Sequence, residues 1–247
     1  IAVGVLGGVL VGTVVGMING VVISKTTIPP FIVTLAGMFF ARGMTSIISQ
    51  EMISINNETF KSIATFKMYL PFGGYLNKKG IMIYPYIYPT VIIAIAVLLL
   101  VFAVLKYTKF GRSIYAIGGN EQSALLLGLN VRKIKLQAYI LDGFLAGLGG
   151  LLFCMNTCSG FVEQAKGFEM DAIAMAVFGG ISSTGGKGNL AGGIISAFII
   201  VCLRVGLGQK NVNAQVILLI IGVLLVAAVA LPNIIGDVKK AVAMKKN

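Results

Sequence analysis

Residues 106–135 read KYTKFGRSIYAIGGNEQSALLLGLNVRKIK and separate two long apolar runs of the sequence. The segment carries six basic residues and one acidic residue, Glu121. Both flanking runs are long enough to cross a bilayer as helices, and short basic loops between such helices are retained in the cytoplasm. We therefore expect this loop to face the cytoplasm, which fixes the topology of the chain. Residues 123–129 within it read as a short helix that ends at or just after Gly128.

The composition predicts an all-α, polytopic membrane protein. Of the 247 residues, 57% are hydrophobic and 11% are charged, which is more apolar surface than the single core of a soluble chain can hide. The net charge is +12, but the basic residues gather beside apolar runs and in the tail at 236–247. Positive-inside bias accounts for them, so we expect the lipid bilayer and not nucleic acid as their surroundings. The chain has no histidine and its three cysteines lack zinc-ligand spacing, so we expect no metal site.

Six apolar runs predict full membrane helices, and a seventh is too short for one. The six runs lie at residues 1–23, 31–49, 90–105, 136–157, 190–207 and 214–231. The mixed composition of residues 50–89 predicts an extracellular segment. Residues 172–181 are apolar, but ten residues are too few for a helix that crosses a bilayer.

The number of crossings predicts that this short piece is a broken membrane segment. The basic loop and the C-terminal tail are both expected in the cytoplasm, so the chain crosses an even number of times between them. The long runs in between number three, so residues 172–181 must complete a crossing as a half-helix continued by SSTGGKGN, residues 182–189. Irregular backbone at membrane depth is tolerated only where protein or water satisfies its polar groups. This segment is therefore the first candidate for a transport path.

Glycine recurs at every fourth position of the first apolar run. Glycine at this spacing leaves a flat stripe along one helix face, which lets a neighbouring helix approach closely. We predict a helix-packing role, and no catalytic one, for Gly4, Gly8, Gly12, Gly16 and Gly20.

Charged residues within or beside the membrane runs need partners, because an unpaired charge at mid-bilayer costs about 3 kcal/mol or more. Arg42 and Arg204 lie within runs, and Arg204 is near enough to a helix end to extend toward the interface. Asp142 reads as a helix-packing hydrogen bond or an ion pair, which we favour, or as a proton or substrate site. Glu169 and Asp171 read as a docking site or as caps of the half-helix, and capping is favoured for Asp171.

Three segments resemble the membrane permeases of bacterial ABC importers for monosaccharides, the ribose, xylose and galactose group. They are GRSIYAIGGNEQSALLLGLNVRKIK at 111–135, GFEMDAIAMAVFGGISSTGGKG at 167–188 and IPPFIVTLAGMFFARG at 28–43. The last, followed by ISIN at 53–56, is most similar to the galactofuranose permeases. The resemblance implies one transmembrane permease domain, residues 1–247, in the bacterial inner membrane with a cytoplasmic C-terminus. The family's Gly-rich, Asp-containing N-terminal segment is absent, and the sequence begins inside an apolar run, so we expect N-terminal helices to be missing.

The resemblance also implies partners. They are a second permease subunit, identical or different, a cytoplasmic ABC ATPase, and an extracellular or periplasmic sugar-binding protein. Residues 179–188, GGISSTGGKG, lack the Gly, Lys and Ser/Thr spacing of a phosphate-binding loop, so ATP is expected on the partner and no cofactor on this chain.

By the same resemblance, residues 118–128 would be the coupling element that lies in a groove of the ATPase. Glycines allow tight turns and positive φ around the short helix, while Ala124, Leu125 and Leu126 give it an apolar face. The alternative is an amphipathic helix at the lipid headgroups. The coupling residues are predicted to be Gly111, Arg112, Gly118, Gly119, Asn120, Ala124 and Gly128.

The sequence predicts a subunit that moves a monosaccharide by alternating access and is not an enzyme. A path for a hydroxyl-rich solute needs scattered polar groups, because tight binding would slow release. The candidates are Asn19, Phe31, Thr34, Asn156 and Ser182; each polar one also reads as a helix–helix hydrogen bond. Three alternatives stay open: an ABC permease for another small polar solute such as a furanose signal molecule or an amino acid, an ion-coupled transporter that uses Asp142, and a structural membrane anchor.

Overall fold

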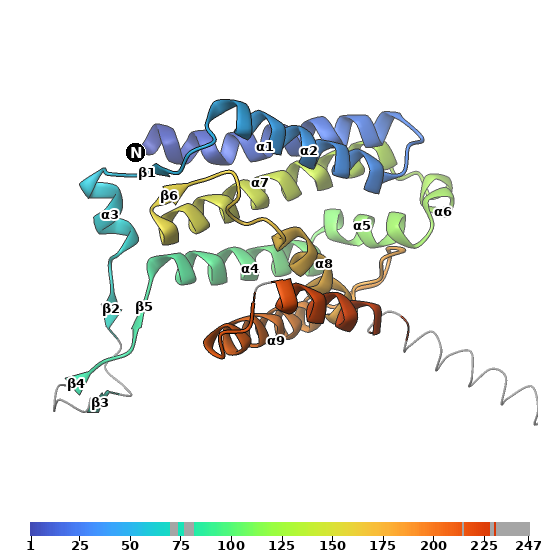
Figure 1. Cartoon of the computed structure of the whole chain (residues 1–247). Helices are drawn as coiled ribbons and strands as arrows, with labels where there is room; N and C mark the ends of the chain where they lie inside the picture. The colour runs from blue at the N-terminus through green and yellow to red at the C-terminus, as the bar shows by residue number, and fades with distance from the viewer. Residues whose placement is uncertain (70–73, 77–81, 214, 228–229, 231–247) are drawn as a thin grey trace, which may run out of the picture. The chain divides into compact units, whose positions relative to one another are not determined.

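The computed structural model describes residues 1–69, 74–76, 82–213, 215–227 and 230 (Figure 1). The chain divides into two compact units. Unit 1 consists of Ile1–Ile114 and Gln122–Gln164, and unit 2 consists of Tyr115–Glu121 and Ala165–Asn247. The basic loop is therefore shared, because its central residues 115–121 belong with the C-terminal part of the chain.

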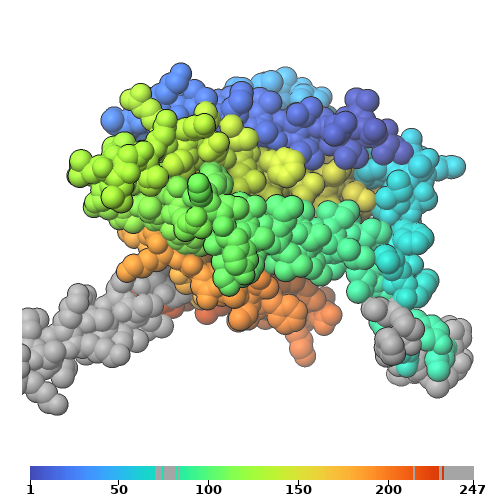
Figure 2. Space-filling model, turned by 180° about the vertical axis from the view of Figure 1, so that it is seen from behind, coloured from blue at the N-terminus to red at the C-terminus, as the bar shows by residue number. Residues whose placement is uncertain are grey.

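Long apolar helices build unit 1, as an all-α membrane bundle requires. They are α1 (Ala2–Lys25), α2 (Pro30–Ile48), α4 (Pro89–Tyr107) and α7 (Val131–Thr157). Each is long and apolar enough to cross a membrane. Helices α1 and α7 pack along their length, and α4 also contacts α7 (Figures 1 and 2). The predicted fold class is confirmed.

The contact between α1 and α7 depends on glycines from both helices. A Cβ added to Gly12 would lie 2.6 Å from the carbonyl oxygen of Gly143 and 2.7 Å from the Cα of Gly147. A Cβ on Gly16 would overlap the Tyr139 carbonyl oxygen and lie 2.7 Å from the Cα of Gly143. These distances leave no room for any side chain, so the two backbones touch directly.

The contact with α7 requires small residues only at the later glycines of α1. A Cβ on Gly20 would lie 2.9 Å from the Cβ of Tyr139, so this third glycine also lies in the contact. Gly4 and Gly8 differ, because an added Cβ at either would meet nothing within 4 Å. The structure thus places three of the five glycines, Gly12, Gly16 and Gly20, where a packing role requires small residues.

The segment between α2 and α4 folds at one end of unit 1. Helix α3 (Glu58–Ala64) packs Phe60 and Ala64 against Met155 near the end of α7. Its N-cap is Asn57, whose side chain accepts a hydrogen bond from the Phe60 backbone N–H at 3.0 Å. Within the segment, short antiparallel pairs join β2 (Met68–Tyr69) with β5 (Tyr86–Ile87) and β3 (Tyr75–Leu76) with β4 (Met82–Ile83). Its first strand, β1 (Ile53–Ser54), pairs with β6 (Ser159–Gly160), which follows α7.

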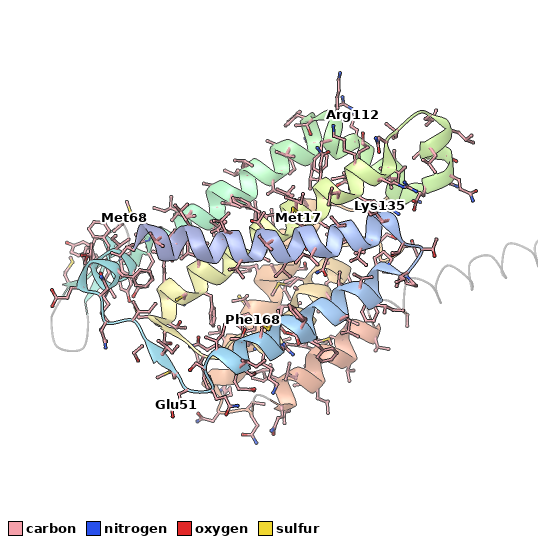
Figure 3. The ribbon with its side chains drawn as sticks, turned by 90° about the horizontal axis from the view of Figure 1, so that it is seen from above. Met17, Glu51, Met68, Arg112, Lys135 and Phe168 are labelled. Atoms are coloured by element: carbon pink, nitrogen blue, oxygen red, sulfur yellow. The ribbon has the colours of Figure 1, made fainter. Side chains whose placement is uncertain are left out.

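Charge and composition divide unit 1 along its length. Arg112 and Lys135 lie at one end of the helices, whereas Glu51 and Met68 lie at the other, with Met17 between them (Figure 3). The basic loop and the mixed segment therefore lie at opposite ends of the long helices. This arrangement matches a bundle with two chemically different membrane faces.

The basic loop contains two helices, not one. Helix α5 (Lys109–Gly119) was not predicted, and α6 (Glu121–Leu126) starts two residues before the expected helix at 123–129. Gly128 ends the loop helix with φ +79°, a left-handed conformation that favours glycine. Helix α7 then starts at Val131, five residues earlier than predicted, behind an N-cap at Asn130.

Unit 2 contains the short apolar piece. Helix α8 (Phe168–Phe178) has 11 residues, about 16 Å at 1.5 Å per residue, and falls short of a hydrocarbon core of about 30 Å. Helix α9 (Leu190–Gln209) and the helix Gln215–Ala227 pack with it around Ala174, Ile200, Ile217 and Ile221. The last predicted span is described only in part, and the prediction of a cytoplasmic tail falls on residues 231–247, outside the described residues.

Candidate functional site

The loop begins with a tight turn between α4 and α5 at Thr108, and Gly111 lies in the first turn of α5. A Cβ at this position would overlap the Leu105 carbonyl oxygen and lie 2.6 Å from its carbonyl carbon. The Thr108 hydroxyl accepts a hydrogen bond from the Gly111 N–H at 3.2 Å, and Arg112 donates to the Tyr107 carbonyl at 3.4 Å. Gly111 therefore allows a close approach of backbone; its φ is not positive.

The short helix α6 turns a different face outward than the sequence suggested. Ala124 is only 1% exposed and accepts a hydrogen bond from the Leu129 N–H at 3.1 Å. The exposed apolar residues follow it: Leu125 is 55% exposed, Leu126 90% and Leu127 78%. Of the three residues predicted to form the apolar face, Leu125 and Leu126 are therefore open to a partner, whereas Ala124 is buried and is not.

Gly118 and Gly119 close α5 and meet the turn that follows α8, all within unit 2. A Cβ on Gly118 would lie 2.5 Å from the Gly186 backbone nitrogen. Neither Gly118 nor Gly119 has a positive φ, so the expected left-handed turns on this side of the loop are absent. Asn120 continues the chain and donates its backbone N–H to the Ala116 carbonyl at 3.1 Å.

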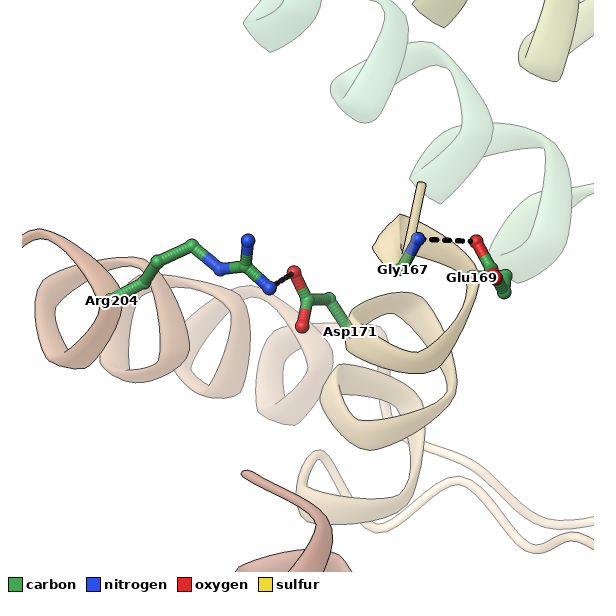
Figure 4. Close-up of polar contacts among 4 residues, drawn as sticks. All are labelled: Gly167, Glu169, Asp171 and Arg204. Atoms are coloured by element: carbon green, nitrogen blue, oxygen red, sulfur yellow. Dashed lines mark hydrogen bonds and ion pairs between the residues drawn. The ribbon is translucent and has the colours of Figure 1, made fainter. Parts of the chain in front are cut away.

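Two acidic residues lie in the first turn of α8 (Figure 4). The Glu169 carboxylate accepts the Gly167 N–H at 3.0 Å. Asp171 is buried and pairs with Arg204 of α9, with 2.5 Å between Oδ2 and Nη2. Asp171 thus lies in the first turn of α8, where the prediction placed it, and its carboxylate also pairs with Arg204. The Arg204 side chain, predicted to extend toward the interface, instead reaches Asp171. Asp171 and Arg204 are 33 positions apart, and no local pattern signals their pairing.

The guanidinium of Arg204 also lies against an aromatic ring. Its Cζ is 5.6 Å from the centroid of Phe168, within range of a cation–π contact. Asp171 Oδ1 and Arg204 Nε are buried and have no hydrogen-bond partner among the described residues. Among the described residues, Arg204 is therefore held by its charge contact with Asp171 and by the ring of Phe168.

The predicted path residues of unit 1 do not form one cluster. Asn19 lies at the contact of α1 with α2, where a Cβ on Gly37 would be 2.7 Å from its Oδ1. Thr34 bonds to the carbonyls of its own helix, and Phe31 is exposed. Asn156 is exposed near the far end of α7, 17 residues or about 26 Å beyond the part of α7 that faces this end of α1.

Ser182 belongs to the turn after α8 in unit 2. Its hydroxyl is 2.8 Å from that of Thr184, and its backbone N–H donates to the Lys187 carbonyl at 2.9 Å. Ser182 therefore shapes an irregular turn, which is the structure expected beside a broken membrane segment.

A cavity of about 330 Å³ lies in unit 1 at the end that carries Glu51. It is lined by side chains of α2, β6 and the end of α7, and includes none of the predicted path residues. The rings of Phe153 and Phe161 face it together with hydroxyl, amide and carboxylate groups, among them Ser49, Glu51, Ser159 and Gln164. Among the described residues, no three metal-ligating side chains lie close enough to hold an ion.

Residues 1–229, which run through both units, match the family described as "Branched-chain amino acid transport system / permease component". The chain belongs to this family of membrane permeases. The ribose import permease protein RbsC of Haemophilus influenzae is 34% identical over 93% of this chain and 68% of its own length. The inner membrane ABC transporter permease protein YjfF of Escherichia coli K12 is 36% identical over 73% of this chain and 51% of its own length.

A third relative of this permease is the D-allose transport system permease protein AlsC of Escherichia coli K12, 34% identical over 94% of this chain and 66% of its own length. The chain thus spans between one half and about two thirds of the relatives it matches. No solved structure gives a significant match. The predicted resemblance to monosaccharide ABC permeases is confirmed, and so is the class: these relatives are transport permeases, not enzymes.

Proposed function

We propose that this permease is the membrane-spanning subunit of an ATP-driven importer that moves a monosaccharide into the bacterial cell by alternating access. Similar permeases are named for the transport of ribose, D-allose and L-arabinose. These substrates share a compact, uncharged, hydroxyl-rich ring. A monosaccharide is therefore the proposed solute, and the similarity to galactofuranose permeases adds furanose forms to the set.

The observation that carries the proposal is the exposed leucine run of the basic loop, Leu125–Leu127. Leu126 is 90% exposed, and it lies within the loop at residues 106–135 that carries six basic residues. Contiguous exposed apolar side chains on a polar loop mark an interaction surface. A cytoplasmic ATPase that binds and hydrolyses ATP is the partner proposed for it, because the chain carries no phosphate-binding loop of its own. The loop and the C-terminus would then both face the cytoplasm.

Two further features support an assembly of several chains. Helices α2 and α4 bury none of their residues in this chain, so lipid or a second permease subunit must cover them. The cavity beside Glu51 lies at the end of unit 1 opposite the basic loop, where an extracellular binding protein would release its sugar. Its two phenylalanine rings and its polar groups suit a sugar, which combines apolar C–H faces with hydroxyls.

The experiment is reconstitution of the complete permease with its ATPase and binding protein in proteoliposomes. We expect uptake of one labelled sugar among ribose, allose, arabinose and galactofuranose, dependent on ATP and on the binding protein. Uptake without ATPase that collapses when ion gradients are dissipated would contradict the proposal. Asp142 makes this alternative worth testing, because it is exposed on α7 and forms no ion pair with any described residue.

A further inference from the structure

Unit 2 joins two segments that lie far apart in the sequence. The end of α5, within the proposed coupling loop, meets the glycine turn after α8 at two double glycines, Gly118–Gly119 and Gly185–Gly186. A Cβ on Gly185 would lie 2.8 Å from the Gly118 carbonyl oxygen, and one on Gly186 would lie 2.5 Å from the Gly119 nitrogen. No side chain separates the two backbones. If one segment moves toward the other, the second segment must therefore move as well.

The turn on the α8 side is closed on itself. Ser182 donates its N–H to the Lys187 carbonyl at 2.9 Å, and the Gly185 N–H donates to the Ser182 carbonyl at 3.1 Å. Gly185 and Gly186 have φ of +89° and +73°, so their backbone conformation also requires glycine. A turn fixed in this way transmits a push at Gly186 to the elements at its two ends.

Those elements, α8 and α9, are tied together. The Ser196 hydroxyl donates to the Met175 carbonyl, and a Cβ on Gly179 would lie 2.5 Å from the Cα of Gly193. Further along α8, Asp171 pairs with Arg204. The short helix is therefore attached to α9 at its start, middle and end.

We propose that the contact of Gly118–Gly119 with Gly185–Gly186 is the joint through which movement of the loop drives α8 and α9. This inference rests on the proposed function, since it assumes that an ATPase binds the loop. The loop residues 115–121 belong to the same compact unit as α8 and α9, and Asn120 and Glu121 connect them to α6. A displacement of α6 by the ATPase would thus be passed along the chain through Glu121 and Asn120 to Gly118–Gly119, and from there to the broken segment.

The first test uses Gly118→Ala, with Gly206→Ala of α9 as the matched control. Both glycines have ordinary φ, but a Cβ at 118 collides with Gly186, whereas a Cβ at 206 meets nothing within 4 Å. In the reconstituted importer we expect Gly118→Ala to lower sugar uptake about tenfold or more while ATPase binding and ATP hydrolysis persist. Gly206→Ala should stay within about twofold of the unaltered protein.

The second test approaches the joint from the other side. Gly186→Ala and Gly180→Ala carry the same backbone strain, because their φ values are +73° and +77°. Only the Cβ at 186 enters the joint; the one at 180 meets nothing within 4 Å. We expect Gly186→Ala to uncouple hydrolysis from uptake and Gly180→Ala not to do so.

The outcomes separate the joint from the proposed function. If the unaltered complex shows no ATP-dependent sugar uptake, the function itself is wrong. If it transports and Gly118→Ala and Gly186→Ala transport equally well, the joint is wrong. The joint is also wrong if these two variants disappear from the membrane or lose the ATPase while their controls do not, since the contact would then serve folding or docking.

Discussion

Arg204 of α9 reaches into the first turn of α8 and holds Asp171 at 2.5 Å, so two membrane segments joined by a glycine-rich turn are also joined by charge. Asp171 is buried, and one of its oxygens has no hydrogen-bond partner among the described residues. The pair is thus the main electrostatic tie between α8 and α9 in the part of the chain that the structure describes. Its loss would leave a charge without its counter-charge inside the bundle.

Replacing Asp171 by Asn should therefore destabilise the protein strongly. Leaving one member of a fully buried ion pair alone costs about 3–5 kcal/mol. Asp171 is buried but the Arg204 side chain is 34% exposed, so we expect a cost at or below the lower end of that range. We expect a clear fall in the thermal unfolding midpoint of the purified protein in detergent. Glu58→Gln is the control, because Glu58 also lies in the first turn of a helix, α3, but is exposed. Equal midpoints for the two variants would contradict the structural role of the pair.

Gly12→Ala should weaken the packing of α1 against α7. The new methyl group would lie 2.6 Å from a Gly143 carbonyl oxygen, and overpacking of this kind costs about 1–3 kcal/mol. Gly4→Ala makes the same change on the same helix where an added Cβ meets nothing within 4 Å, and should be neutral. Unfolding midpoints check both, and an unchanged midpoint for Gly12→Ala would rule out the close contact.

Leu126→Lys should remove the ATPase from the complex. It places a charge at the most exposed residue of the leucine run, whereas Gln122→Lys adds the same charge to an exposed polar position of α6. Co-purification of the ATPase with each variant measures the difference. Retention of the ATPase by Leu126→Lys would exclude the leucine run as its docking surface. Ala124→Arg is a poorer test, because Ala124 is buried and the change would disturb the loop itself.

Asp142→Asn separates an ATP-driven importer from an ion-coupled transporter. Asp142 is exposed on α7, so its neutral analogue should leave ATP-driven uptake within about twofold of the original. The measurement is uptake with and without a protonophore. Loss of uptake on Asp142→Asn, together with sensitivity to the protonophore, would favour the ion-coupled alternative.

The membrane helices could be predicted because their signal is local. A run of about 20 apolar residues between basic or mixed segments has few other structures open to it. The short length of α8 could be predicted for the same reason. The end of the loop helix at Gly128 could be predicted because a left-handed backbone conformation favours glycine.

The site was less predictable, because its features depend on distant residues. Nothing near Asp171 in the sequence indicates Arg204, and nothing near Gly118 indicates Gly186. Ala124 and Leu126 lie two positions apart on a short helix, and only tertiary packing decides which of them is buried. Helix α5 was missed because its glycines read as turn residues, whereas Gly111 and Gly118 serve close backbone contacts.

The orientation of the loop tests the account most directly. The measurement is labelling of single cysteines by a membrane-impermeant maleimide in intact cells and in inverted vesicles. The background lacks the native cysteines Cys154, Cys158 and Cys202. We predict that Gln122→Cys reacts only in inverted vesicles and that Met68→Cys, at the opposite end of unit 1, reacts only in intact cells. Reaction of Gln122→Cys from outside intact cells would contradict the orientation, the ATPase partner and the import mechanism together.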